Sequence, residues 1–371
     1  MRSAGARVLV LNAGSSSFKF AVFEGLRRLW GGQIEVPSST THVGALGDLL
    51  GALSKRDMAI DTMSACGHRV VHGGTRFSAP TLIDAERRSS LGELRSLAPL
   101  HNGPAIDALD AICAAAPHVP QIACFDTAFH SSVPEVESRY ALPATLHAAG
   151  YRRFGFHGLN FEHVTAAVAE HTGGVAPPRL LILHLGNGCS LCAVKGGASI
   201  ATTMGYSTLD GLVMGTRCGS IDPGVLLALQ RDRAMTLEQL EHLCYRQSGL
   251  LAVSGRSSDM RELLRIDDAA CRGAVEHFCY WVSRHAGSMA AALGGIDAVA
   301  FTGGIGAGSA SVRAQIAAHM EWLGLDLDLE RNVHQEAALA SGHSRCKIWR
   351  IEANEELAIA RHLRAMIRAP A

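Results

Sequence analysis

Two stretches of the chain share one pattern, RVLVLNAGSSSFKFAVFEG at 7–25 and RLLILHLGNGCSLCAVKGG at 179–197. They align without a gap at an offset of 172 residues, and seven of the 19 positions are identical, including Gly14/Gly186 and Ala21/Ala193. Each runs from an apolar segment through a turn of small residues into a second apolar segment, the pattern of a β-hairpin. Two similar hairpins that open two similar lengths of chain predict a duplicated domain, and chance similarity between two core hairpins is the alternative.

Behind each hairpin, short apolar runs alternate with well-punctuated helices. Strands are predicted at 66–71, 121–125 and 298–301. Helices are predicted at 105–115 behind Pro104, at 161–171 behind Asn160, behind Asp222, behind a Thr236–Gln239 capping box, and at 267–293, 309–323 and 354–368. This alternation indicates an α/β protein of two similar lobes. We expect an N-terminal lobe over 1–150, a C-terminal lobe over 151–353, and a final segment, 354–371, that packs back on the first lobe.

Composition places the chain among ordinary globular proteins. Of its 371 residues, 48% are apolar and 18% are charged, and the net charge is +0. A neutral balance argues against nucleic acid or an anionic membrane as the main partner, since both favour a basic excess. No apolar stretch reaches the roughly 18 residues of a membrane span, and ten irregularly spaced cysteines are typical of a cytoplasmic protein. Cys189 and Cys192 should point to opposite faces of a strand, so we expect no shared metal there.

Three glycine-rich loops could bind phosphate. The first, Asn12 to Lys19, combines small residues, which let backbone N–H groups approach an anion, with a lysine charge, although the Walker A spacing is absent. The second hairpin has a counterpart at His184 to Gly188, and a third loop, Phe301 to Gly308, joins a strand to a helix. Each alone could be an ordinary turn. Together they suggest one phosphate chain in a cleft between two lobes, the arrangement of the ribonuclease-H-like superfamily of sugar kinases, actin and heat-shock ATPases.

Four charged or titratable residues stand inside apolar or glycine-rich frames. They are Arg69 in a predicted strand, Asp126 just past another strand, His157 between an aromatic residue and a glycine, and Arg217 in a loop. Because a buried charge is costly unless it is paired, each is either part of an internal ion pair or a functional group. Four such residues beside three phosphate loops favour a functional role.

With these motifs the chain resembles the acetate kinase (acetokinase) family over nearly its whole length. The resemblance rests on ten ordered strings: VLVLNAGSSSFK (8–19), GHRVVHGG (67–74), LAPLHN (97–102), FDTAFH (125–130), RRFGFHG (152–158), HLGNGCS (184–190), TMGYSTLDGLVMGTR (203–217), SSDMR (257–261), FTGGIG (301–306) and NEELAIA (354–360).

The resemblance implies roles for the matching residues. Arg69 and Arg217 would bind the carboxylate and the moving phosphoryl group, and Asp126 and His157 would stand at the reaction centre. Mg²⁺ or Mn²⁺ would be positioned by Asn12 and Glu355. ATP or ADP would be bound by Lys19, His184, Leu185, Gly186, Asn187, Gly188, Asp259, Met260, Arg261, Gly304, Ile305, Gly306, Ala307 and Gly308. The family also implies a homodimer.

The chain departs from the family pattern at several positions. Gly306-Ala307-Gly308 stands where the family usually has Gly-Glu-Asn, and Ser220 stands where it usually has an acidic residue. Thr208 replaces a common proline, and 159–161 reads Leu-Asn-Phe where the family tends to read Thr-Ser-His. None of the central charged positions is lost.

We therefore predict the reversible reaction acetate + ATP ⇌ acetyl phosphate + ADP. A carboxylate of pKa about 4 to 5 is already ionised at pH 7, so no base is needed to make the nucleophile. The site must instead overcome repulsion between two anions, which explains the cationic groups, and Asp126 is expected to orient an arginine or a metal-bound water. Propionate or another short carboxylate is an alternative substrate. An alternative of a different class is an ATP-driven conformational protein of the actin or chaperone type, without an acyl substrate.

An apolar wall is expected beside the acyl methyl group. Val71 lies two residues after Arg69 in a predicted strand, so the two side chains face the same side. The resemblance implies that Val71, Leu100 and Phe156 form this wall. The alternative is that all three belong to the ordinary core.

Overall fold

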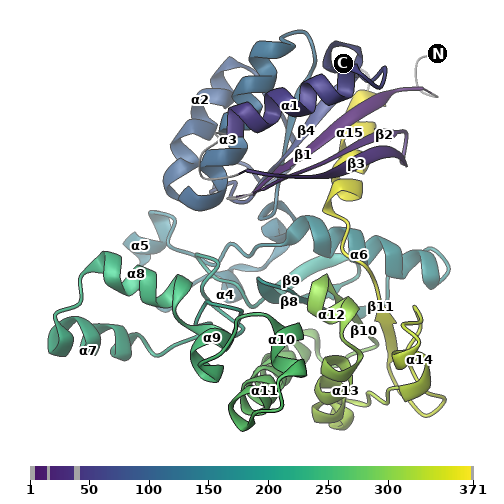
Figure 1. The fold of residues 1–371 in the computed structure, drawn as a ribbon. Helices are drawn as coiled ribbons and strands as arrows, with labels where there is room; N and C mark the ends of the chain where they lie inside the picture. Colours follow the sequence, from purple (N-terminus) through teal and green to yellow (C-terminus); the bar gives the residue numbers. More distant parts are fainter. Residues whose placement is uncertain (1–4, 15–16, 37–41, 369–371) are drawn as a thin grey trace. The chain divides into compact units, whose positions relative to one another are not determined.

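A computed structural model describes residues 5–14, 17–36 and 42–368, which form two compact units (Figure 1). The first unit comprises Met1–Ser131, Phe156–His163 and Asn354–Ala371, and the second comprises Ser132–Gly155 and Val164–Ala353. The chain therefore passes between the units four times, once within helix α6 (Gly158–His171). The lobes expected from the sequence, 1–150 and 151–353, stay a prediction.

A six-stranded sheet of order β3-β2-β1-β4-β6-β5 forms the centre of the first unit. The predicted hairpin is present, because β1 and β2 pair antiparallel, while β4 and β6 run parallel to β1. The strands are β1 (Arg7–Ala13), β2 (Ser17–Glu24), β3 (Arg27–Glu35), β4 (Ala65–Val70), β5 (Thr81–Leu82) and β6 (Gln121–Phe125).

The second unit has a five-stranded sheet of order β11-β10-β7-β8-β9. Its strands are β7 (Arg179–Leu185), β8 (Cys189–Lys195), β9 (Ala198–Thr202), β10 (Ala298–Thr302) and β11 (Lys347–Arg350). An antiparallel β7–β8 hairpin is followed by two strands parallel to β7, as β1–β2 is followed by β4 and β6. Register shifts also fall at nearly the same point, at Val22/Phe23 and at Ala193/Val194. The α/β fold is confirmed, and the matching strand orders support the duplication.

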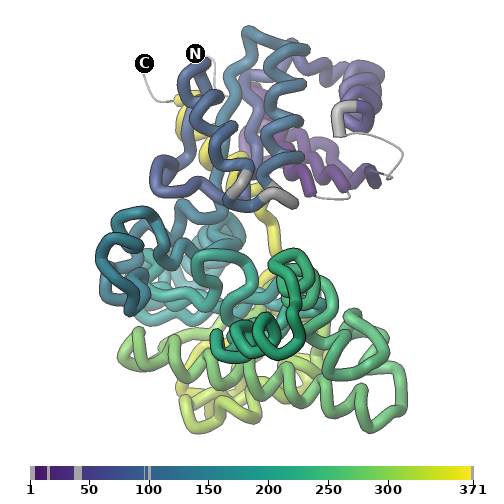
Figure 2. Tube along the Cα trace, turned by 90° about the vertical axis from the view of Figure 1, so that its left-hand side faces the viewer, coloured from purple at the N-terminus to yellow at the C-terminus, as the bar shows by residue number. Residues whose placement is uncertain are grey.

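Both faces of the first sheet are buried. Along β1, Leu9 and Leu11 pack with α1 (His42–Ser54) and α3 (Pro99–Ala115), whereas Val8 and Val10 pack with α15 (Glu355–Arg368). Successive residues of a strand point to opposite faces, so burial on both sides explains the continuous apolar run. Figure 2 shows α15, in yellow, against the purple and blue strands of the same unit.

Close approach of α15 to the sheet requires a glycine in β4. A Cβ atom at Gly67 would lie 2.5 Å from Ile359 Cγ2 and 2.7 Å from Leu363 Cδ1. Any larger residue would push the helix away from the sheet.

The remaining helices are short apart from α11, and several begin and end as predicted. They are α2 (Ala85–Glu93), α4 (Glu135–Ser138), α5 (Ala144–Ala148), α7 (Pro223–Arg233), α8 (Leu237–Arg246), α9 (Gly249–Ser254), α10 (Met260–Arg265), α11 (Ala269–Leu293), α12 (Gly303–Gly308), α13 (Ala310–His319) and α14 (Leu329–Val333). Asp222 caps α7, Thr236 and Gln239 form the capping box of α8, and α11 ends at Gly294 in the left-handed conformation. Among the described residues, no helix combines the length and the apolar character needed to span a bilayer.

Two predicted helix starts are wrong. α3 begins at Pro99, not behind Pro104, because a proline already occupies the first turn and the Asn102 amide donates to the Ala98 carbonyl at 2.7 Å. α6 begins at Gly158, not behind Asn160, because the Phe161 amide already donates to the His157 carbonyl at 3.0 Å. The glycine string after β10 also forms an extra helix, α12, before α13.

Candidate active site

A largely buried ion pair joins the carboxyl ends of neighbouring strands in the first unit. Arg69, near the end of β4, donates from Nε to Asp126 Oδ1 at 3.0 Å and from Nη2 to Asp126 Oδ2 at 2.6 Å. A third bond runs from Arg69 Nη1 to Oδ1 of Asn12, at the end of β1, at 3.3 Å. Since β1, β4 and β6 are parallel, their carboxyl ends meet at one edge, the usual position of an α/β site.

The charge balance at this edge keeps Arg69 ionised. Burial alone would lower the pKa of the Arg69 guanidinium, but Asp126 and then Glu355, the first residue of α15, hold it above its ordinary value. Burial raises the pKa of the Asp126 carboxyl, against the opposing effects of Arg69 and of the His157 backbone N–H. Both oxygens of Asp126 already accept bonds from Arg69, so this carboxylate suits orientation of the arginine better than proton abstraction.

A strained turn holds His157 beside Asp126. The backbone of His157 is left-handed, with φ of 60°, a conformation that non-glycine residues adopt only when their surroundings fix it. The next amide, that of Gly158, donates to the Asp126 carbonyl at 2.9 Å. A Cβ atom at Gly158 would lie only 2.1 Å from that oxygen, so the turn depends on the glycine.

The predicted acyl wall lies partly within the described residues. Val71 is buried directly after β4, and buried Phe156 packs edge-on against the His72 ring with centroids 5.3 Å apart. Leu100 lies in the first turn of α3, and its side chain lies outside the described residues. The wall stays a prediction.

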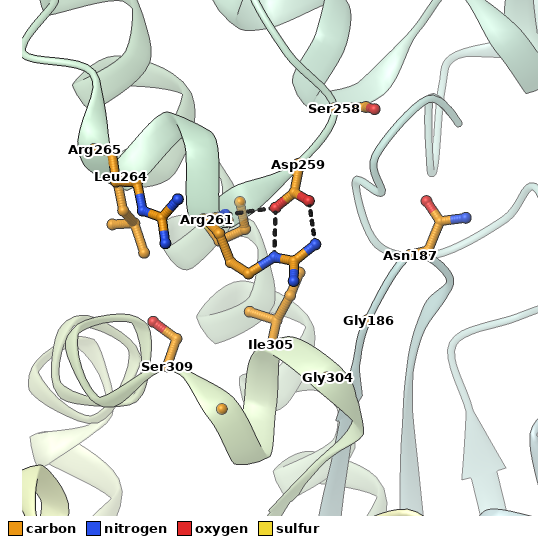
Figure 3. A pocket seen from close by; sticks show the side chains of 12 residues that line it. Gly186, Asn187, Ser258, Asp259, Arg261, Leu264, Arg265, Gly304, Ile305 and Ser309 are labelled. Carbon is orange, nitrogen blue, oxygen red and sulfur yellow. Dashed lines mark hydrogen bonds and ion pairs between the residues drawn. The ribbon is translucent and has the colours of Figure 1, made fainter. Parts of the chain in front are cut away.

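The second unit contains a pocket of about 680 Å³ beyond the carboxyl ends of β7 and β10 (Figure 3). Glycine makes the approach of α12 to β7 possible, because Gly303 has φ of 79° and a Cβ atom there would lie 2.5 Å from the Leu185 carbonyl oxygen. The pocket is lined by Gly186 and Asn187 after β7, by Ser258, Asp259, Met260, Arg261, Leu264 and Arg265 of α10 and its approach, and by Gly304, Ile305, Gly308 and Ser309.

Most residues predicted to bind nucleotide line this pocket, and some do not. Outside the lining are His184 and Leu185, buried in β7, Gly188, the last residue of the turn before β8, and Gly306 and Ala307, buried in α12. Lys19 lies in the first unit, exposed on β2 and directly opposite Asn12 in the β1–β2 register.

Sequence reasoning missed four lining residues, Ser258, Leu264, Arg265 and Ser309. A signal existed for two of them, because Leu264 and Arg265 follow Arg261 by three and four residues on one helix and so share its face.

An ion pair fixes one wall of the pocket. Asp259 Oδ1 accepts the Arg261 backbone N–H at 2.8 Å, which caps α10, and the carboxylate also accepts from Arg261 Nε and Nη2 at 3.1 and 2.6 Å (Figure 3). These bonds lower the pKa of Asp259 to about 2. The carboxylate therefore stays ionised and paired, and adds little repulsion toward an incoming phosphate.

Arg217, also in the second unit, has no such counter-ion among the residues that the structure describes. Its Nη1 donates to the Thr208 carbonyl at 3.2 Å, and no carboxylate of residues 5–14, 17–36 and 42–368 forms an ion pair with it. Burial lowers the pKa of its guanidinium. A half-buried cation without a counter-ion suits an anionic ligand.

The loop that carries Arg217 is held tightly. The Leu250 amide donates to the Met214 carbonyl at 2.8 Å, and a Cβ atom at Gly249 would lie 2.2 Å from that oxygen.

Ser220, where the family usually has an acidic residue, donates its hydroxyl to Asp210 Oδ1 at 2.9 Å. Arg153 Nη1 donates to the other oxygen of Asp210 at 3.0 Å.

The oxygen donors of the first unit fit Mg²⁺ only in part. No group of three His, Cys, Asp or Glu side chains able to hold a metal occurs in the described part of the chain. Asn12 and Asp126 nevertheless direct amide and carboxylate oxygens at Arg69, and the charge of Glu355 acts on the same guanidinium. Because Mg²⁺ is commonly held by one or two carboxylates together with substrate phosphates, this set fits an ion that arrives with a nucleotide.

Comparisons with known proteins point to one family. The Acetokinase family matches residues 27–361. An acetate kinase of Rhodopseudomonas palustris is 41% identical over 387 aligned residues, covering 96% of this chain and 97% of the relative, and one of Methylocella silvestris is 41% identical with 97% and 98% covered. Among solved structures, a propionate kinase from Francisella tularensis superposes with a TM-score of 0.91 at 34% identity, covering 96% of this chain and 98% of that one. Porphyromonas gingivalis acetate kinase gives 0.89 at 31% identity, with 98% and 100% covered.

Proposed function

The chain belongs to the acetokinase family, and from that premise we propose that it transfers the γ-phosphoryl group of ATP reversibly to acetate, forming acetyl phosphate and ADP. The observation that carries the proposal is the ion pair between buried Asp126 and partly exposed Arg69 at the carboxyl ends of β4 and β6. It holds a guanidinium rigidly where a small carboxylate can be bound.

Arg69 keeps donors available for a substrate. A guanidinium has five N–H donors, and Asp126 and Asn12 occupy Nε–H, one N–H of Nη2 and one of Nη1. One N–H on each of Nη1 and Nη2 remains available to a substrate carboxylate. Asp126 fixes the orientation of the guanidinium.

The chemistry requires charge neutralisation more than proton transfer. Acetate is ionised at neutral pH and attacks as it is, so the barrier comes from bringing two anions together. Arg217, which lacks a counter-ion among the described residues, would stabilise the charge on the transferred phosphoryl group, with His157 as a further donor. When bound, Mg²⁺ would neutralise nucleotide phosphate charge, and Asn12 and Glu355 would hold it.

ATP would occupy the pocket of the second unit. Its apolar side chains, Met260, Leu264 and Ile305, suit an adenine base. The turns at Gly186 and Gly304 present small backbone surfaces to phosphate. Lys19, opposite Asn12 in the β1–β2 register, would add positive charge toward the phosphates, as the family resemblance implies.

Three further properties belong to the same proposal. The family resemblance supports a homodimer. The ten cysteines are all free thiols, which supports a reducing, cytoplasmic setting. The similarity to a propionate kinase supports propionate as a second substrate, since one methylene in an apolar pocket is worth about 1 to 3 kcal/mol.

Trapping with hydroxylamine tests the proposal. The protein is incubated with ATP, MgCl₂ and hydroxylamine, with and without acetate, and both acyl hydroxamate and ADP are measured. We expect hydroxamate only with acetate, in amounts that match ADP. Equal ADP release with and without acetate, and no hydroxamate from acetate or propionate, would instead support an ATPase of the actin or chaperone type.

A further inference from the structure

Arg313, in α13, is a fully buried arginine with an unusual set of partners. Its side chain is 0% exposed, and within the described ranges no carboxylate forms an ion pair with it. Nη1 donates to the carbonyl oxygens of Gly306 at 2.9 Å and Ala307 at 2.7 Å. Nε and Nη2 donate to the side-chain and backbone oxygens of Asn332 at 2.7 and 3.1 Å, and Nη2 also donates to Gln335 Oε1 at 3.0 Å.

The two carbonyls that Arg313 binds lie near the end of α12, a helix with little stability of its own. Four of its six residues, GGIGAG, are glycine, and each glycine costs about 1 kcal/mol relative to alanine in a helix. The last carbonyls of any helix lack partners within it. Arg313 supplies donors to two of them, and Arg350 Nε adds another bond to the Ala307 carbonyl at 2.8 Å. Positive charge at this end also suits the helix dipole.

α12 forms one side of the pocket in the second unit. Gly304, Ile305 and Gly308 line the pocket, whereas Arg313 does not. Gly306 and Ala307, which Arg313 binds, lie between these lining residues on the same short helix. Any movement of their carbonyls therefore moves the lining.

We propose that Arg313 is the positioning residue of the nucleotide pocket: by binding the carbonyls of Gly306 and Ala307 it holds α12 in the conformation that receives ATP or ADP. This inference rests on the proposed function. The helix also contains the Gly306-Ala307-Gly308 departure, and its four glycines make it dependent on donors from outside.

Titration calorimetry with ADP tests the inference in Arg313→Met and Arg313→Lys, alongside KM for ATP, KM for acetate and melting temperature. Arg179→Met is the matched control. Arg179 also donates to a carbonyl just past a helix, that of Gly294 at 2.8 Å, and pairs with Asp297, but it lies at the opposite end of β7. Gly186, the first lining residue, lies seven residues further along, which at about 3.3 Å each places it about 23 Å away.

We expect Arg313→Met to weaken ADP binding at least tenfold and to raise KM for ATP similarly, with KM for acetate within twofold of wild type. Arg313→Lys should restore part of the affinity, since an ammonium can reach one carbonyl but cannot reproduce the fork. Arg179→Met should lower the melting temperature and leave ADP affinity within twofold. An Arg313→Met protein that melts early but binds ADP like the control would overturn the inference.

If Arg313→Met does not fold, a less disruptive variant tests whether donors to the α12 carbonyls support ADP binding. Arg350→Met removes one bond to the Ala307 carbonyl from a side chain that is only partly buried, and Glu352→Gln removes the ion-pair partner of Arg350 while sparing that bond. We expect a severalfold loss of ADP affinity in Arg350→Met alone, and equal affinities in both variants would overturn the inference. Wild-type protein that binds no ADP would overturn the proposed function as well.

Discussion

Two arginines, Arg69 and Arg217, stand in opposite electrostatic situations. Arg69 is held by a buried carboxylate, whereas Arg217 is half-buried beside a carbonyl and pairs with no carboxylate in the described part of the chain. The sequence identifies both as charges in apolar surroundings, but it does not reveal which one is paired. That depends on strand register: Arg69 lies opposite Cys124 in the β4–β6 pair, which brings Asp126, two residues further on, within reach.

Replacement of Arg217 by alanine should remove turnover and spare the fold. The side chain forms one bond to a carbonyl and no ion pair within the described residues, so we expect a melting temperature within a few degrees of wild type. Loss of its charge should reduce kcat by about a hundredfold, or about 3 kcal/mol of transition-state stabilisation. Steady-state kinetics and thermal denaturation of the same preparation check both points. Near-normal kcat would remove Arg217 from the reaction centre.

Replacement of Val71 by alanine should change substrate preference. If Val71 lines the acyl pocket, the shorter side chain makes room for one more methylene, and kcat/KM for propionate should rise relative to acetate while KM for ATP stays unchanged. Val70→Ala is the control, because Val70 faces the opposite side of the strand and packs in the core. Its expected effect is a lower melting temperature with an unchanged preference. If Val71→Ala behaves like Val70→Ala, Val71 is ordinary core.

At the scale of elements, local signals predict helix ends well where a side chain or glycine makes the capping bond. Asp222, Thr236 and Gly294 each end or begin a helix as predicted, because the capping interaction is encoded within a few residues. The prediction from Pro104 failed because this proline lies inside α3, a position that proline rarely occupies, while an earlier proline, Pro99, takes the first position of the helix. Tertiary contacts, which a single segment does not contain, decide such cases.

The turn into α12 offers a test within one element. Gly303→Ala places a methyl group in a left-handed backbone 2.5 Å from the Leu185 carbonyl oxygen, so we expect a loss of about 1 to 3 kcal/mol in the free energy of unfolding. Gly304→Ala is the matched control. Nothing lies within 4 Å of a Cβ atom there, and we expect equal or greater stability. Urea denaturation compares the two variants. A Gly303→Ala protein as stable as Gly304→Ala would show that the clash at position 303 is relieved by movement of its neighbours.

At the scale of the whole molecule, the duplicated hairpins predicted the architecture. Seven shared positions in two short stretches correspond to two sheets with the same core order, β3-β2-β1-β4-β6 and β9-β8-β7-β10-β11. Individual roles were harder to predict. Lys19, grouped with the nucleotide residues from the resemblance, lies in the first unit opposite Asn12, whereas the pocket lies in the second unit, and its role stays a prediction.

The pH dependence of stability should follow two buried histidines. Burial lowers the pKa of His68 and of His130 to about 4, below the value near 6.5 of the unfolded chain. Between these values the unfolded state binds more protons, so stability is full above about pH 6.5 and falls as pH drops toward 4. Each histidine should lower the free energy of unfolding by about 2 kcal/mol at pH 5.

Denaturation by urea at pH 7.5, 6 and 5 measures this slope. His68→Asn removes one of the two histidines and should therefore reduce the slope of stability against pH. His118→Gln, at an exposed histidine of the same unit, should leave the slope unchanged. A wild-type stability that stays constant from pH 7.5 to 5 would contradict the neutral state of these rings.

The most direct test of the central claim is the reverse reaction, synthesis of ATP from acetyl phosphate and ADP followed with luciferase. Phosphoryl transfer between a carboxylate and a nucleotide predicts that wild-type protein forms one ATP for each acetyl phosphate consumed and that Arg217→Ala forms almost none. An absence of ATP from acetyl phosphate and from propionyl phosphate, in a preparation that hydrolyses ATP without any carboxylate, would contradict the account.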